Sequence, residues 1–349
     1  MAYTTINKSS DYFNTKLYTG GSGNTAHTGV GFQPDLVWIK ERTRVRNHAW
    51  FDAIRGARYW IGSNSNGAQD YNSGAYLVSL DSDGFTTTDT DVVGKNGLTY
   101  ASWNWKAGTT GSGTSTGSGT GKAYSYSVST TAGFSIVKYI GNGTAGHTIP
   151  HHLGVAPKMI IVKSIAAVQS WIVLPPTITG YDKDMKLEDN TALGNSDVWN
   201  NTAPSSTVFS VGTNTNMNDN NATFISYSFA EKQGYSKFGT YIGNGNADGR
   251  FVYTGFKPAF IIVKRTDNSG DWQLMDNKRD SINVMDTNLF PNSADADTAS
   301  NTYDTDFISN GFKFRGTSGA RNGSGMSYIY MAFAEEPLVA SNYNVATAR

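Results

Sequence analysis

The chain has 349 residues, of which 38% are hydrophobic, 13% aromatic and 16% charged, and its 28 basic residues balance its 28 acidic ones. This length favours two or three domains, and zero net charge gives no argument for binding nucleic acid or an anionic membrane. The absence of cysteine excludes disulfides, thiol catalysis and Cys-ligated zinc. The 38 glycines, with abundant Asn, Ser and Thr, are typical of short strands joined by many turns.

The first thirty residues lack a charged segment followed by an apolar one, so no signal peptide is expected. No apolar run approaches the roughly 20 residues that span a bilayer. The sequence therefore predicts a soluble protein that is made in a cytoplasm and does not insert into a membrane.

Three segments of the chain, beginning at Leu17, Lys138 and Thr240, can be laid over each other. Each has an aromatic-led strand, a Gly/Asn turn, a Gly-apolar-x-Pro element and an apolar strand that ends in Lys. A tryptophan follows 16, 14 and 14 residues after the prolines. We interpret these prolines and tryptophans as structural anchors of the repeat: Pro34, Pro157, Pro258, Trp50, Trp171 and Trp272.

Each repeat closes with an alternating aromatic strand, in which Trp105, Phe229 and Phe333 are equivalent. The strands LVWIK, MIIVK and FIIVK are continuously apolar, which predicts central strands covered on both faces. We expect an all-β protein of three tandem antiparallel β-sandwich domains, jelly-roll-like, at 1–108, 133–234 and 235–349, the last with a C-terminal tail. Residues 109–132, rich in Gly, Ser and Thr, are expected to be a flexible linker.

Sequence motifs for catalysis or cofactors are weak. YIGNGTAG at 139–146 fits the dinucleotide spacing GxGxxG, but no helix follows, and YIGNG recurs at 241–245, which favours a hairpin turn. GTSTG at 113–117 matches a nucleophile elbow without the strand-to-helix turn that the motif needs. His147, His151 and His152 are expected to be loop residues and not a zinc site. We therefore predict no catalytic, cofactor-binding or metal-binding residue, and no enzyme.

Two groups of residues are candidates for contact surfaces. The first is a basic segment that could dock an acidic protein surface or an anionic glycan, or be a solvated face: Lys40, Arg42, Arg44, Arg46, Arg55 and Arg58. The second is a set of aromatic residues outside the repeat pattern, for which exposed contact and ordinary packing are both open: Trp60, Tyr71, Trp199 and Tyr303.

The opening DYFNTKLYTGGSGNTAHTGVGFQPDLVWIKERT, then FDAIRGA, SLDSDGFTT and YASWNWKAG, and the ending YIYMAFAEEPLVASNYNVATAR, resemble virion structural or tail-fibre-like proteins of marine bacteriophages. The resemblance implies a non-enzymatic virion protein, located in the virion, in multiple copies or as a homo-oligomer, with other virion proteins as partners and a host surface glycan as a further one. Tail fibre or appendage is the first expectation. Alternatives are a capsid decoration protein acting as a pseudo-trimer, and a glycan-binding or glycan-degrading tailspike-like protein.

Overall fold

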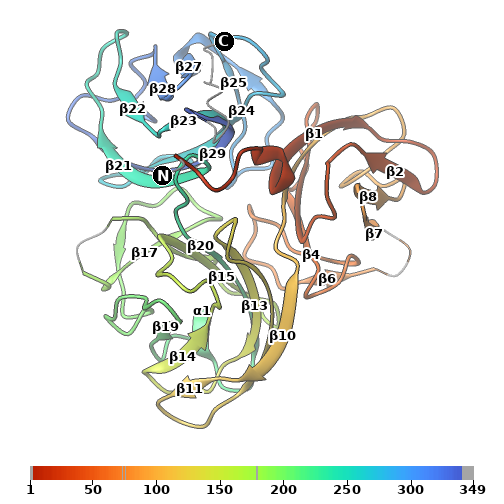
Figure 1. Cartoon of the computed structure of the whole chain (residues 1–349), viewed down its shortest axis with the longest axis vertical. Helices are drawn as coiled ribbons and strands as arrows, with labels where there is room; N and C mark the ends of the chain where they lie inside the picture. Colours follow the sequence, from red (N-terminus) through yellow and green to blue (C-terminus); the bar gives the residue numbers. More distant parts are fainter. Residues whose placement is uncertain (1–2, 73, 75, 178–179, 340–349) are drawn as a thin grey trace.

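The computed structural model describes residues 3–72, 74, 76–177 and 180–339. Within these ranges the only helices are η1 (Ser9–Asp11), α1 (Thr215–Asn218) and η2 (Asn301–Tyr303), so the predicted all-β class is confirmed. No helix in the described ranges has the length and hydrophobicity to cross a membrane. Figure 1 shows three lobes around a common centre: lobe 1 carries strands β1 to β9, lobe 2 carries β10 to β20, and lobe 3 carries β21 to β29.

Lobe 1 has a four-stranded sheet in the order β1 (Phe13–Thr19), β9 (Thr99–Trp105), β3 (Leu36–Glu41), β4 (Ala49–Asp52). Its second sheet has the order β2 (Thr25–Thr28), β8 (Gly84–Thr87), β7 (Leu77–Asp81). A short hairpin is formed by β5 (Tyr59–Trp60) and β6 (Asp70–Tyr71).

Lobe 2 has an eight-stranded sheet in the order β10 (Thr109–Thr114), β12 (Ala123–Ser129), β13 (Phe134–Ile140), β20 (Thr223–Phe229), β15 (Met159–Ser164), β16 (Ile172–Leu174), β17 (Lys183–Lys186), β18 (Gly194–Asn195). Its second sheet has the order β11 (Thr116–Gly117), β14 (His147–Pro150), β19 (Val208–Val211).

Lobe 3 has a four-stranded sheet in the order β21 (Ser236–Ile242), β29 (Ser327–Pro337), β23 (Phe256–Arg265), β24 (Gln273–Asp276). Its second sheet has the order β22 (Phe251–Tyr253), β28 (Gly311–Phe314), β27 (Thr305–Ile308), and β25 (Thr287–Asn288) pairs with β26 (Thr298–Ala299).

The large sheets share one strand order, seen as β1-β9-β3-β4, β13-β20-β15-β16 and β21-β29-β23-β24. Their registers also agree, because Leu36 pairs with Trp105, Met159 with Phe229 and Phe260 with Phe333. The predicted equivalence of Trp105, Phe229 and Phe333 is therefore confirmed by strand pairing.

The continuously apolar strands are buried on both faces, as predicted. On β3, Val37 and Ile39 belong to the core between the two sheets of lobe 1, with Phe85 from the small sheet. Their neighbours Leu36 and Trp38 belong to a second core, which contains residues of all three lobes. Successive side chains on a strand point to opposite faces, so each such strand needs two apolar environments. The neighbouring lobes supply the second one.

The centre of the shared core is a triangle of aromatic rings. The ring centroids of Trp105 and Phe229 lie 6.4 Å apart, those of Trp105 and Phe333 5.7 Å, and those of Phe229 and Phe333 6.1 Å. One ring comes from each lobe at the same register position. The three lobes therefore meet around an approximate threefold axis.

The expected flexible linker at 109–132 is wrong. Its residues form β10, β11 and β12, and β10 pairs with β12 at the edge of the large sheet of lobe 2. A Cβ added to Gly111 would meet the Tyr126 hydroxyl at 2.6 Å, and one added to Gly113 would meet the Tyr124 hydroxyl at 2.7 Å. The tyrosines lie over glycine backbone across the strand pair, so this segment buries apolar surface through its partner strand.

The YIGNG turn does not close a hairpin, contrary to the expectation. β13 pairs with β12 and β20, whereas β14 pairs with β11 and β19, so the turn carries the chain from one sheet to the other. A Cβ on Gly20, Gly141 or Gly243 would lie 2.3 to 2.4 Å from a backbone carbonyl oxygen. Close backbone approach therefore explains why the turn's first glycine recurs.

Candidate functional site

The lobes meet at three seams, named here seam 1/2, seam 2/3 and seam 3/1 after the lobes that they join. At seam 1/2 the amide of Gln69 donates to Ile165 O (3.3 Å) and the amide of Gln169 donates to Asn66 O (3.0 Å). The other seams have the same pair of bonds: Leu193 N to Thr266 O (3.0 Å) and Gly270 N to Asn190 O (2.9 Å), then Asp297 N to Arg42 O (2.7 Å) and Arg46 N to Ala294 O (2.9 Å).

These bonds involve equivalent residues. The acceptors Arg42, Ile165 and Thr266 each lie eight residues after the buried prolines Pro34, Pro157 and Pro258. In each lobe, the backbone carbonyl eight residues after the proline accepts a hydrogen bond from the preceding lobe. A backbone amide later in the same lobe donates the equivalent hydrogen bond to the following lobe. The three seams therefore close a ring with threefold pseudo-symmetry inside one chain.

Side-chain N–H groups repeat the same cycle. Trp171 Nε1 donates to Gly62 O of lobe 1 (2.9 Å), and Trp272 Nε1 donates to Lys186 O of lobe 2 (2.8 Å). In lobe 1 the position fourteen residues after the proline is His48, whose Nε2 lies 3.0 Å from Phe290 O of lobe 3.

His48 acts as a neutral donor. Its Nδ1 accepts from Trp38 Nε1 at 2.8 Å, which assigns the proton to Nε2. Burial lowers the pKa of His48 well below its usual value, so the ring stays uncharged. All three tryptophan anchors are in the core as predicted, but Trp50 aligns by register with Val173 and Leu274, and His48 is the true counterpart of Trp171 and Trp272.

Two of the three seams also contain a buried ion pair, and the two pairs occupy equivalent positions. Asp52 pairs with Arg55 in lobe 1, and Asp276 pairs with Arg279 in lobe 3, both at 2.5 Å with side chains no more than 1% exposed. Each carboxylate also accepts from an aromatic residue of the next lobe: the Tyr227 hydroxyl donates to Asp52 (2.8 Å), and Trp103 Nε1 donates to Asp276 (3.2 Å).

The remaining seam lacks both partners. Lobe 2 has Pro175 at the aspartate position, and lobe 3 has Met331 at the position of Trp103 and Tyr227. A buried carboxylate is costly without donors, and a buried donor is costly without an acceptor. The buried carboxylate and its donor from the next lobe are therefore both present at two seams and both absent from the third.

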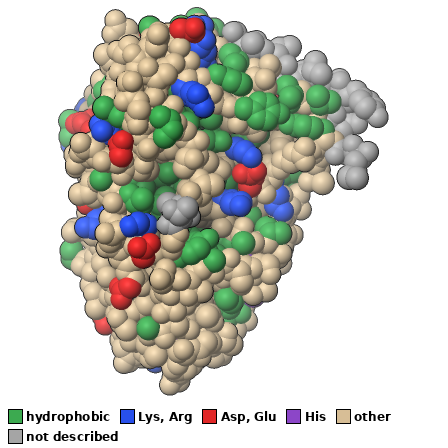
Figure 2. Space-filling view, turned by 90° about the vertical axis from the view of Figure 1, so that its left-hand side faces the viewer, with side chains coloured by type: hydrophobic (Ala, Val, Ile, Leu, Met, Phe, Trp, Pro, Cys, Tyr) green, Lys and Arg blue, Asp and Glu red, His purple; other side chains and the backbone are tan. Residues whose placement is uncertain are grey.

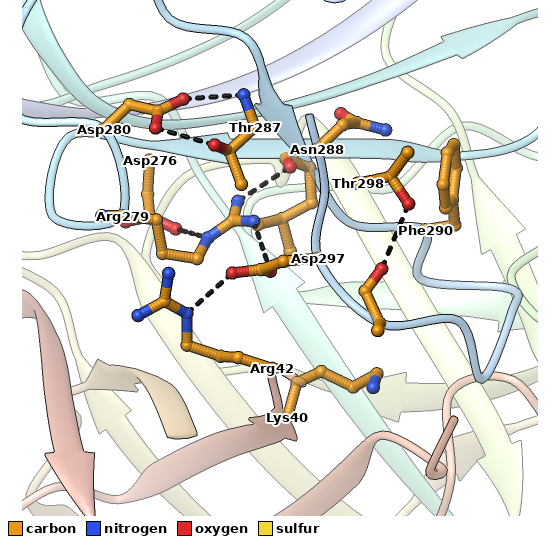
Figure 3. Close-up of polar contacts among 12 residues, drawn as sticks. Lys40, Arg42, Asp276, Arg279, Asp280, Thr287, Asn288, Phe290, Asp297 and Thr298 are labelled. Carbon is orange, nitrogen blue, oxygen red and sulfur yellow. Dashed lines mark hydrogen bonds and ion pairs between the residues drawn. The ribbon is translucent and has the colours of Figure 1, made fainter. Parts of the chain in front are cut away.

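Seam 3/1 has the most extended polar network (Figure 3). Arg42 Nε contacts Asp297 Oδ2 at 2.6 Å, and Arg279 Nη1 contacts Asp297 Oδ1 at 3.0 Å. One carboxylate thus joins a guanidinium of lobe 1 to one of lobe 3, next to the pair of Arg279 with Asp276.

The predicted basic docking patch is not a continuous surface. Lys40 is fully buried and donates to Glu41 O at 2.6 Å, and Arg55 is buried in its pair with Asp52. The other basic residues, Arg42, Arg44, Arg46 and Arg58, are half-buried. Arg42 pairs with Asp297, and Arg44 and Arg46 both pair with Asp91 (2.9 and 3.2 Å). Figure 2 shows blue and red side chains together in small groups of mixed sign on the face that it draws, with no broad basic area.

The buried lysine recurs in every lobe. Lys40, Lys163 and Lys264 are 0% exposed at the ends of β3, β15 and β23, and each ammonium donates to backbone carbonyls. Burial lowers the pKa of each from 10.5 to about 8. These lysines lie at the start of the seam segments, so they are part of the ring and not of a docking surface.

The four candidate contact aromatics differ in their exposure to solvent. Trp199 is 1% exposed and packs against Phe209, so an exposed role for it is wrong. Tyr71 is 53% exposed. Trp60 is half-buried and donates to Asp70, and Tyr303 is half-buried with the guanidinium of Arg321 4.8 Å from its ring centroid.

One cluster has the outline of a nucleophile, a base and an orienting group. Ser115 Oγ lies 2.6 Å from His147 Nε2, and His147 Nδ1 lies 3.2 Å from Asn218 Oδ1. However, Ser115 is 3% exposed, and its hydroxyl also bonds both backbone groups of Lys122. A substrate carbonyl has no access to such a hydroxyl, so the cluster holds β11 to β14. Among the described residues, no three His, Cys, Asp or Glu side chains gather as a metal site.

Residues 8–337 match the family described as a domain of unknown function, DUF7483. The chain belongs to the DUF7483 family. The match begins before β1 and ends with β29, so it covers all three lobes and their seams, and the DUF7483 unit is the complete ring. No curated protein and no solved structure matches the chain.

The seam residues His48, Gln69 and Tyr227 were not singled out from the sequence. His48 had a signal, because it lies 14 residues after its repeat proline, as Trp171 and Trp272 do. The equivalent seam residues Gln69, Leu193 and Asp297 lie 35, 36 and 39 residues after theirs, so spacing gave no signal for them. A search for tryptophan alone finds Trp171 and Trp272, but in lobe 1 it selects Trp50 in place of the true counterpart, His48.

Proposed function

We propose that this protein is a non-enzymatic structural protein of a bacteriophage particle, built from three tandem β-sandwich repeat domains. It covers a threefold or quasi-threefold position on the head, as a one-chain equivalent of a trimer. The observation that carries the proposal is the set of three seams, each with the same pair of backbone bonds at equivalent residues. Its partners are other virion proteins.

The closed ring favours head decoration over the tail fibre that was the first expectation from the sequence. A protein that matches a threefold site must present three similar surfaces at 120° intervals, and three copies of one chain are the usual way to do so. Here one chain supplies all three lobes and forms the seams between them. The polar clusters that could suggest catalysis are occupied in the seams or, for Ser115, buried.

The experiment is immunogold labelling of purified particles in which mass spectrometry detects the chain. We expect gold over the whole head surface. Gold confined to tails or fibres would support the tail role instead, and absence of the chain from purified particles would refute a structural role in the virion.

A further inference from the structure

The outer edges of the three large sheets differ. β1 and β21 are the edge strands in lobes 1 and 3, whereas in lobe 2 the equivalent strand β13 pairs with β12, and β12 pairs with β10 at the edge. Figure 1 shows β10 on the outer border of lobe 2, away from the centre where the lobes meet. The edge of lobe 2 is therefore an added strand that has no counterpart among the described strands of the other lobes.

β10 lacks the features by which edge strands usually avoid pairing with other chains. Charged side chains, above all Lys, serve this purpose, and β1 carries Lys16 and β21 carries Lys237. β10 has the sequence TTGSGT, and no charged residue and no proline occurs from residue 107 to residue 121. No bulge interrupts its pairing with β12. β10 is therefore a regular and uncharged edge.

Alternate residues of β10 direct their backbone groups to the open edge. The amide of Ser115 donates to Lys122 O at 2.8 Å, so the odd-numbered residues of β10 are the ones that bond to β12 in this antiparallel pair. The even-numbered residues Thr110, Ser112 and Thr114 direct N–H and C=O groups outward. All three are exposed, and these backbone groups have no hydrogen-bond partner in the described part of the chain.

This arrangement makes the edge complementary to itself. In an antiparallel pair of two β10 strands centred on Ser112, Ser112 lies opposite Ser112 of the second copy, and Thr110 lies opposite Thr114. Each of the three opposed pairs exchanges two backbone hydrogen bonds, which gives six bonds across one twofold axis. The side chains that meet there are small hydroxyl residues, which are favourable cross-strand neighbours.

The same pairing is unfavourable at the edge of lobe 1. Lys16 is the middle residue of the seven in β1, so two β1 strands paired about their centres would place Lys16 opposite Lys16. Like charges directly opposite each other destabilise a strand pair. Self-pairing is therefore specific to the added edge of lobe 2.

We propose that β10 pairs with β10 of a second copy of this chain across a twofold axis. The pair joins the large sheets of two copies of lobe 2 into one continuous sheet. This contact lies between chains, whereas the three seams lie within one chain. It does not depend on where the protein sits in a particle.

The first test is disulfide formation, because the chain has no cysteine of its own. Ser112→Cys places a thiol at the twofold axis, where the Cα atoms of a hydrogen-bonded antiparallel pair lie about 5.5 Å apart, within the range of a disulfide. Thr240→Cys places a thiol at an exposed position of the edge strand β21 and is the matched control. Under mild oxidation we expect a covalent dimer of Ser112→Cys and a monomer of Thr240→Cys. A monomeric Ser112→Cys, or equal crosslinking of both variants, would overturn the proposal.

The second test is sedimentation equilibrium of the full chain, which measures pairing without a crosslink. We expect a monomer–dimer equilibrium that Ser112→Lys weakens about tenfold or more, because it places like charges opposite each other, and that Thr19→Lys at the exposed end of β1 leaves unchanged. The melting temperature of Ser112→Lys shows whether this variant is folded. A wild type that stays monomeric up to about 1 mM, a dimer that a folded Ser112→Lys retains in full, or association beyond the dimer would each contradict a twofold pair of β10 edges.

Discussion

Substitution of Trp105 tests whether the three lobes share one core. Trp105 is 1% exposed and contacts Phe229 of lobe 2 and Phe333 of lobe 3. Truncation of a buried aromatic residue to Ala costs about 3–5 kcal/mol, and we expect the upper part of this range because the ring also contacts Phe13 (4.9 Å) and Phe260 (5.7 Å).

The matched control is Trp105→Phe, the residue type of lobes 2 and 3 at this position. Trp105 Nε1 is buried without a hydrogen-bond partner, so its loss removes an unsatisfied donor worth about 1–3 kcal/mol. This gain offsets the smaller ring, and we expect Trp105→Phe to stay within about 1 kcal/mol of the wild type.

The assay is amide hydrogen exchange followed by mass spectrometry. We expect Trp105→Ala to lower protection in β20 and β29 as well as in β9, because all three strands contribute to the central triangle. Lower protection confined to lobe 1, with β20 and β29 unchanged, would refute a shared core.

Three further predictions follow from the seams and the buried groups. Asp276→Ala leaves the 0% exposed guanidinium of Arg279 with one carboxylate fewer, and urea unfolding should show a loss of about 3–5 kcal/mol, against less than about 1 kcal/mol for Glu231→Ala in the partly exposed pair with Lys237. The unfolded chain keeps its lysine protons to about pH 10.5, whereas Lys40, Lys163 and Lys264 lose theirs near pH 8 when folded. The free energy of unfolding should therefore rise between pH 8 and 9, by about 1 kcal/mol per lysine. Lys163→Met should remove about a third of this rise and Lys158→Met none of it, and a wild-type curve that falls would contradict the buried sites. A fluorophosphonate should leave Ser115 unlabelled by mass spectrometry, because the hydroxyl is buried; stoichiometric labelling would show that the cluster with His147 is accessible.

The repeat could be predicted from the sequence because it depends on local rules. Clear patterns mark the apolar strands after Pro34, Pro157 and Pro258 and the alternating strands that contain Trp105, Phe229 and Phe333. These positions are equivalent in the structure.

The ring could not be predicted in the same way, because it depends on contacts between residues at least 73 positions apart in the sequence. Nothing near Gln69 in sequence indicates that its amide meets Ile165. Lysine is typical of a protein surface, but Lys40 is buried because a neighbouring lobe covers it. The segment 109–121 was misjudged because its own side chains bury little, whereas Tyr124 and Tyr126 cover its glycines from the paired strand.

The central claim, that one chain takes the place of a trimer at threefold positions of a phage head, is tested most directly by stoichiometry. Quantitative mass spectrometry of purified particles measures the ratio of this chain to the major capsid protein. Three capsid subunits surround each threefold or quasi-threefold position, so full coverage predicts about one chain for every three capsid subunits. A ratio that corresponds to only a few chains per particle would contradict the claim.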